Sequence, residues 1–345
     1  FHPDYLVERT INPDWETLAV ARQQGVLTAL VRPAGSGLGG QAALIHTEGY
    51  TFEDLAVQGG IAVAVSLAGG RFGGGDGHQH DDGDADAYVC CSELMSGMVV
   101  QDNPRVQGQG EQEAGGRFDG VTRRLRETRE YLDKRAKATP DKPEAFDARY
   151  EALTKSLSGD LPFMISANTA SDIREAVAWA QSEKVRVLLY GCSGAGEMIE
   201  WLARKEVPIV LSAVFGMPEA DRPTDFFYSL PSRLAKAGVK FALSTNDAHN
   251  VRQLRDQAGF AAAFGMDRED AVRAITLWPA EILGVSHRIG AIKPGMEGTL
   301  ILTDGDLLET KSRVLRAWIA GREVELTNKQ TRLFEKYNGR PKPKG

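Results

Sequence analysis

Two residues in the last third of the chain, Asp247 and His249, have side chains and a spacing that could bind a metal ion. Carboxylate oxygens and imidazole nitrogens are ordinary zinc ligands, and a bound metal lowers the pKa of its water to near neutrality. Asp247 could then accept a proton from that water as a general base. The alternative is that both residues begin a solvated loop and cap the following helix. We favour the alternative, because two such residues do not complete a metal site.

A denser group of histidines and aspartates lies in a glycine-rich stretch. His78 and His80 are separated by one residue. The aspartates around them are Asp76, Asp81, Asp82, Asp84 and Asp86. This cluster could bind a divalent ion. Its composition is also typical of a flexible acidic loop, and that interpretation is favoured.

Cys192 is the cysteine with the clearest chemical options. The other two, Cys90 and Cys91, are adjacent, and three cysteines do not form a disulfide framework. Cys192 could be a soft metal ligand or a nucleophile, but a small buried residue at a strand end is the favoured reading. The segment after it, residues 193–197, could present backbone N–H groups to an anion or form an ordinary turn.

Apolar runs alternate with amphipathic segments along the chain. The runs are continuous, which is typical of strands covered on both faces of a parallel sheet. They span residues 26–31, 61–67, 162–166, 185–190, 208–214 and 239–244. Helices are expected at residues 14–24, 171–184, 196–205, 231–238 and 252–264. Repeated strand–helix units predict a doubly wound sheet or a closed barrel. No G-x-G-x-x-G follows the first strand, which disfavours a dinucleotide-binding sheet.

Two stretches interrupt this rhythm. Residues 69–87 are the glycine- and aspartate-rich loop, and residues 118–157 predict a charged helical insert that begins with one long solvated helix. Near the C-terminus, residues 298–306 and 314–324 predict short strands around turns. These strands suit a small β-domain beside the main one.

Several blocks resemble the amidohydrolase superfamily, in particular its imidazolonepropionase-like and dihydroorotase-like metal hydrolases. Residues 276–284 (TLWPAEILG) are similar to that family's T-x-x-P-A-x-x-L-G segment, and residues 289–298 are similar to its G-x-I-x-x-G turn into a β-sandwich. Residues 244–246 (Ser-Thr-Asn) stand where the family has Ser/Gly-Thr-Asp at the end of the last barrel strand. In that family the aspartate is a metal ligand and general base.

The resemblance implies an α/β fold, a distorted (β/α)8 TIM-like barrel with a small β-sandwich side domain. Residues 1–285 would form the barrel, residues 286–326 part of a composite β-sandwich, and residues 327–345 a C-terminal tail. The family's first barrel strand ends in His-x-His, and no counterpart of that strand is found in this sequence. Because the chain also starts at Phe1 rather than at Met, we expect it to be processed or partial.

The resemblance also implies that the site lies at the C-terminal mouths of the barrel strands. Where the family has histidine ligands on the fifth and sixth strands, this chain has Ser166 and either Gly191 or Cys192. The predicted substrate-binding residues are Ser166, Asn168, Cys192 and Asn246. Asp247 is the predicted catalytic residue, and Asp247 and His249 are the predicted metal ligands. If a metal is used, zinc is the expected ion.

Three functional hypotheses follow. The first is a metal-dependent hydrolase of non-peptide carbon–nitrogen bonds, in a cyclic amide, an amidine or an N-acyl amino acid. The alternative is a degenerate, metal-free relative that binds a small ligand in the barrel mouth without hydrolysis. A third possibility is a different chemistry that uses Asp247, His249 and Cys192, which would require their side chains to lie within hydrogen-bond reach.

The composition of the chain disfavours some classes of binding partner. The 345 residues carry a formal net charge of −6, which argues against a nucleic-acid or anionic-membrane partner. No apolar run reaches the length needed to span a bilayer. A small-molecule substrate is expected, and a homo-oligomer remains open. Extracytoplasmic or periplasmic placement is favoured over cytoplasmic, because relatives with this altered pattern resemble exported proteins.

Overall fold

The computed structural model describes residues 1–33, 37–66, 116–140, 143–212, 214–218, 222–248 and 250–340. Their main feature is a seven-stranded sheet whose strands are ordered as they occur along the chain. The strands are β1 (Thr28–Val31), β2 (Gly37–His46), β3 (Ala56–Ser66), β4 (Phe163–Ala167), β5 (Val187–Gly191), β6 (Ile209–Leu211) and β7 (Phe241–Leu243). Because both edge strands, β1 and β7, line one cavity, the sheet is curled into a half-barrel.

The first three strands run antiparallel, and the sequence did not predict this. Strand β1 pairs antiparallel with β2, and β2 pairs antiparallel with β3, whereas β3 to β7 are parallel neighbours. Parallel pairing needs a crossover of a dozen or more residues. The connections after β1 and β2 are too short for that, so the prediction of an all-parallel sheet was wrong for this part.

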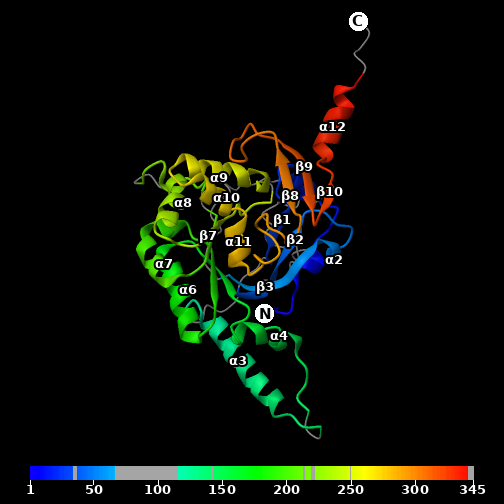
Figure 1. Cartoon of the computed structure of the whole chain (residues 1–345). Helices are drawn as coiled ribbons and strands as arrows, with labels where there is room; N and C mark the ends of the chain where they lie inside the picture. The colour runs from blue at the N-terminus through cyan, green and yellow to red at the C-terminus, as the bar shows by residue number, and fades with distance from the viewer. Residues whose placement is uncertain are drawn as a thin grey trace, which may run out of the picture.

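Helices cover the outer face of the parallel strands (Figure 1). Alternate residues of β4 face opposite ways, as strand geometry requires. Phe163 and Ile165 pack into the large cluster beneath the helices, and Met164 packs into a second cluster inside the curl. The helices of this region are α6 (Ala170–Glu183), α7 (Ile199–Lys205), α8 (Phe226–Lys236), α9 (Leu254–Ala263), α10 (Arg268–Arg273) and α11 (Leu277–Ile282).

Helix α3 (Asp119–Ala136) is part of this packing. The sequence predicted a long solvated helix within an insert, but Val121, Leu125 and Tyr131 are buried. Phe118, just before the helix, stacks on Trp179 of α6 with ring centroids 4.8 Å apart. One apolar stripe among many charges is enough to dock a helix. Two short helices, α4 (Ala148–Glu151) and α5 (Thr154–Leu157), complete the segment.

The chain ends contribute smaller units. Helices α1 (Glu16–Gln23) and α2 (Phe52–Leu55) flank the first strands. The strands predicted near the C-terminus are confirmed as an antiparallel sheet of β8 (Leu300–Thr303), β9 (Val314–Ile319) and β10 (Arg322–Val324). The predicted tail contains a helix, α12 (Lys329–Asn338), which projects from the body (Figure 1).

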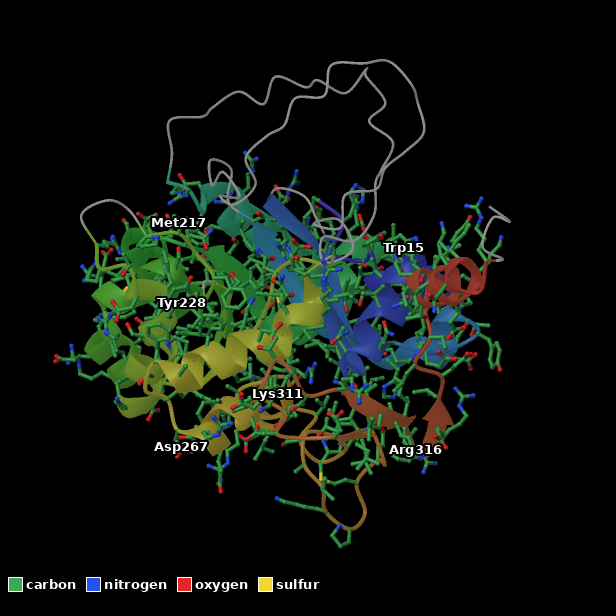
Figure 2. All side chains as sticks on the ribbon, turned by 90° about the horizontal axis from the view of Figure 1, so that it is seen from above. Trp15, Met217, Tyr228, Asp267, Lys311 and Arg316 are labelled. Atoms are coloured by element: carbon green, nitrogen blue, oxygen red, sulfur yellow. The ribbon has the colours of Figure 1, made fainter. Side chains whose placement is uncertain are left out.

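The two flanks of the molecule differ in structure. Seen from above, Tyr228 of α8 and Met217 lie on the helical flank, and Arg316 of β9 lies on the opposite flank with the small sheet (Figure 2). Within the described chain, none of the helices has the length and apolar character needed to cross a membrane.

Candidate functional site

The sequence-predicted mouth residues do lie at one end of the parallel strands. The ladder continues one residue past each strand: Cys192 N donates to Ala167 O at 3.0 Å, Ser212 N to Gly191 O at 3.2 Å, and Ser244 N to Leu211 O at 2.9 Å. Ser166 pairs in register with Tyr190, which faces the inside of the curl. The half-buried Ser166 is therefore on the inner face, as expected from the sequence.

Asn168 accepts hydrogen bonds from the turn after β5. Its backbone oxygen accepts from Gly194 N at 2.6 Å and from Ser193 Oγ at 3.0 Å. Its side-chain amide lies so close to Gly191 that a Cβ at Gly191 would overlap its Oδ1. The predicted substrate-binding residue Asn168 therefore has a structural role in holding the ends of β4 and β5 together.

Cys192 does not face the mouth. Its side chain is fully buried in the outer cluster with Ala195 and Leu230, and its backbone has a positive φ of 59°. Burial without a compensating charge raises the pKa of the Cys192 thiol far above its usual range. A buried, protonated thiol is a poor nucleophile and a poor metal ligand. The substrate-binding role predicted for Cys192 is therefore wrong, because its side chain is part of the buried core.

Asp247 and Asn246 organise the loop that follows β7. Asn246 has a φ of 51°, and its N–H donates to Ser244 Oγ at 3.1 Å. The Asp247 carboxylate accepts from Asn250 Nδ2 at 2.6 Å and from Asn250 N at 3.2 Å. This is the side-chain-to-backbone bonding that aspartate makes at turns and helix starts. His249, the predicted partner ligand, lies outside the described residues.

The described side chains do not form a metal site of the kind the amidohydrolase resemblance implies. Among them, no group of three or more His, Cys, Asp or Glu residues is placed to hold a metal ion. The strand ends of the mouth carry serine, glycine and asparagine, and neutral hydroxyls and amides are weak ligands for zinc. The cluster around His78 and His80 lies outside the described residues.

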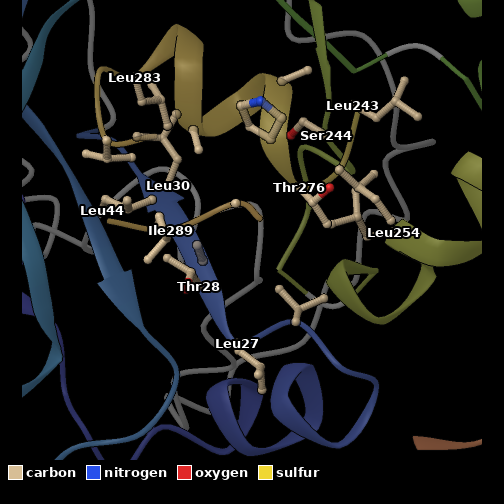
Figure 3. A pocket seen from close by; sticks show the side chains of 18 of the residues that line it. Leu27, Thr28, Leu30, Leu44, Leu243, Ser244, Leu254, Thr276, Leu283 and Ile289 are labelled. Carbon is tan, nitrogen blue, oxygen red and sulfur yellow. The ribbon is translucent and has the colours of Figure 1, made fainter. Parts of the chain in front are cut away.

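A cavity of about 530 Å³ lies inside the curl of the sheet (Figure 3). Thr28 and Leu30 of β1 and Leu44 of β2 form one wall, and Leu243 and Ser244 at the end of β7 form another (Figure 3). Helix α11 and the segment around Ile289 close the remaining side. Of the substrate-binding residues predicted from the sequence, none lines this cavity, although Ser244 and Thr245 precede Asn246 directly.

Three polar residues in the cavity wall were missed by the sequence reasoning. The Arg32 guanidinium lies 4.5 Å from the ring centroid of Tyr190, and both residues are buried. Burial raises the pKa of the Tyr190 hydroxyl, opposed by Arg32, so the phenol is neutral. Arg255 of α9 is the third residue. Arg32 follows one apolar run and Tyr190 ends another, and a polar residue at such a position is the signal that could have identified them.

The proteins that this chain resembles in sequence and in fold are amidohydrolases. Residues 224–329 match the family model described as the amidohydrolase family. Over 79 residues the chain is 28% identical to amidohydrolase tasK of Hapsidospora irregularis, a match that covers 23% of this chain and only 8% of that protein. An amidohydrolase structure from Thermotoga maritima MSB8 superposes with a TM-score of 0.74 at 24% identity, covering 94% of this chain and 79% of that one.

The fold similarity confirms the barrel-type α/β architecture expected from the sequence. It extends over nearly the whole chain, whereas the family match covers the part that contains β7, the loop of Asp247 and the small sheet. These findings show an amidohydrolase family match over residues 224–329 and, over nearly the whole chain, the fold of a solved amidohydrolase.

Proposed function

We propose that this chain binds a small organic molecule in the cavity inside the half-barrel, and that it does so without metal-activated hydrolysis. The observation that carries the proposal is the contrast between two places in one fold. Among the described residues, the strand ends where a metal would be needed carry neutral side chains, and beside them lies a cavity of about 530 Å³.

The cavity has the properties of a small-molecule site. Its volume of about 530 Å³ lies within the range of roughly 300–1,000 Å³ that is usual for ligand pockets. Its wall is mainly aliphatic, with a few polar groups that can orient a ligand. A ligand with an apolar body would bury its surface against this wall, which is favourable by about 25 cal/mol per Å².

Hydrolysis of a non-peptide carbon–nitrogen bond is the second candidate. The family match supports it, because the matched residues include Asp247 and His249. In this case Asp247 would accept a proton from water, and the hydrogen bonds from Asn250 would hold its carboxylate. The remaining ligands of the metal would have to come from outside the described residues.

Metal content separates the two candidates. We expect protein purified without chelators to contain no stoichiometric zinc, manganese or iron by elemental analysis. Added zinc should also leave the melting temperature unchanged, whereas zinc at a hundred times its Kd would stabilise the fold by about 2.7 kcal/mol. One tightly held metal ion per chain would contradict the metal-free proposal and support hydrolysis.

Ligand binding is tested with a neutral apolar probe. Decanol should bind the wild-type chain in isothermal titration calorimetry, and Ala242→Leu should abolish binding by filling the cavity from β7. Ala138→Leu, at an exposed position, is the matched control and should bind as the wild type does. Equal binding by all three proteins would show that decanol does not enter the cavity.

A further inference from the structure

We propose that helix α12 binds to the surface of an anionic lipid membrane. The inference goes beyond the proposed function, because it concerns an exterior helix that contributes no residue to the cavity wall. Three properties of α12 carry it: its exposure, its apolar stripe and the cations beside that stripe.

Helix α12 is fixed to the body at its first turn and is exposed beyond it. Asn328, which is 3% exposed, caps the helix, and its Nδ2 donates to Gln23 Oε1. The backbone N–H of Lys329 donates to Glu16 Oε1. From Arg332 to Asn338 every residue is exposed, and the helix points away from the body (Figure 1). The contacts with α1 therefore set the direction of α12, while most of its surface is accessible to a partner.

An apolar stripe runs along the exposed part of α12. Leu333 is 38% exposed, Phe334 is 68% exposed and Tyr337 is 62% exposed. Successive residues of a helix are about 100° apart, so these three side chains lie within about 100° of the circumference. A stripe of this width is what an amphipathic helix normally buries. A helix of 10 residues is also marginal in water unless such a face is packed. The stripe is therefore suited to burial against an apolar phase outside this chain.

Cations lie beside the stripe. Lys329, Arg332 and Lys336 are exposed along one side of it, and Glu335 is on the opposite side of the helix. Arg340, just after the helix, is also exposed. The formal charge of −6 is an average over the whole chain, and the surface of α12 departs from it. Each lysine or arginine near an anionic membrane strengthens binding by about fivefold. Charge complementarity therefore identifies the partner of this surface as anionic.

The apolar stripe and the cations together favour lipid over other anionic partners. Helices with leucine and phenylalanine on one face and lysine and arginine on another lie in the membrane interface. The Tyr337 ring has an apolar body and a polar tip, which suits the level of the headgroups. A nucleic acid would stack its bases on Phe334 and Tyr337 but would leave Leu333 in water. A second α12 packed on the first would bring like charges together.

The test is co-sedimentation of the full chain with lipid vesicles. Phosphatidylcholine vesicles that contain about 30% phosphatidylserine should bind the chain about tenfold or more tightly than vesicles of phosphatidylcholine alone. Phe334→Ser and Lys336→Glu should each weaken binding to the mixed vesicles by about tenfold or more. Phe334→Leu should retain most of the binding, because leucine keeps the stripe apolar. Urea unfolding should be unchanged in each variant, because both side chains are exposed.

Matched controls lie elsewhere on the surface. Phe146 is 67% exposed, so Phe146→Ser removes an equally exposed phenylalanine. Lys205 Nζ lies 5.7 Å from the ring centroid of Trp201, as Lys336 Nζ lies 5.6 Å from that of Tyr337. Lys205→Glu is therefore the control for the charge reversal on α12. Both control variants should bind the mixed vesicles as the wild type does.

Several outcomes would overturn the membrane inference. It is wrong if the mixed vesicles bind no protein, if both kinds of vesicle bind equally, or if Phe334→Ser binds as the wild type does. If the wild type is instead a dimer in analytical ultracentrifugation and Phe334→Ser makes it a monomer, the stripe packs against a second copy. Decanol binding should be the same in Phe334→Ser as in the wild type, so the ligand cavity is tested separately from α12.

Discussion

The carboxylate of Asp247 is held by Asn250, through the side-chain amide at 2.6 Å and the backbone N–H at 3.2 Å. The two residues form a closed turn directly after β7, at the position where the sequence predicted a catalytic aspartate. The contact gives Asp247 a structural role that does not depend on a metal.

A double-mutant cycle tests this turn. Asp247→Ala should lower the free energy of unfolding by about 1 kcal/mol, and Asn250→Ala should do the same, because each removes a hydrogen bond that orders the loop. The double variant should cost clearly less than the sum, since both changes remove one interaction. Urea unfolding measures all three. Additive costs would mean that the two side chains act independently.

The contact between Asn168 and Gly191 predicts a steric effect. Gly191 has a φ of +93°, and a Cβ there would overlap the Asn168 amide. Gly238 has a φ of +73° with no atom within 4 Å of such a Cβ, so it isolates the backbone cost. Gly238→Ala should cost about 1–2 kcal/mol. Gly191→Ala should cost a further 1–3 kcal/mol or so in urea unfolding. Equal costs would show that Asn168 yields freely.

The packing of α3 predicts a core-like sensitivity. Leu125 is fully buried against the main cluster, so Leu125→Ala should lower the free energy of unfolding by about 2–5 kcal/mol. Arg126→Ala, one residue along on the exposed face, should change it by no more than about 0.5 kcal/mol. If both variants unfold at the same urea concentration as the wild type, α3 is the solvated helix that the sequence predicted.

His46 predicts a pH dependence of stability. Burial lowers its pKa below the ordinary 6.5, although Glu297 nearby opposes this shift. Above pH 6.5 the imidazole is neutral in both states and contributes no dependence on pH. Below 6.5 the unfolded chain binds the proton more readily, so stability falls until the lower folded pKa is passed.

Comparison with His46→Gln isolates this contribution. The difference in unfolding free energy between the wild type and the variant should be constant above pH 7. It should shift in favour of the variant as pH falls below 6.5, in urea titrations at several pH values. A shift in favour of the wild type would show that Glu297, whose Oε2 lies 3.8 Å from His46 Nε2, outweighs burial.

Local pattern was enough to predict the parallel part of the fold. Continuous apolar runs identified β4 to β7, because a strand covered on both faces needs apolar residues at every position. Boundaries were less accurate. Helix α6 was expected to begin at residue 171, but it begins at Ala170, because Thr169 has extended backbone and forms a capping box with Asp172. Helix α8 begins at Phe226, before the predicted start at Pro231.

The candidate site depended on contacts between distant segments. The sequence by itself determined the family blocks, the run of neutral residues at the strand ends and the place of Asp247 after β7. Only the tertiary structure decided that Cys192 faces the outer core, that Asp247 binds Asn250, and that Arg32 and Arg255 share a cavity wall. The physical reason is that a side chain's neighbours depend on how the sheet curls, and the cavity joins residues more than 200 positions apart.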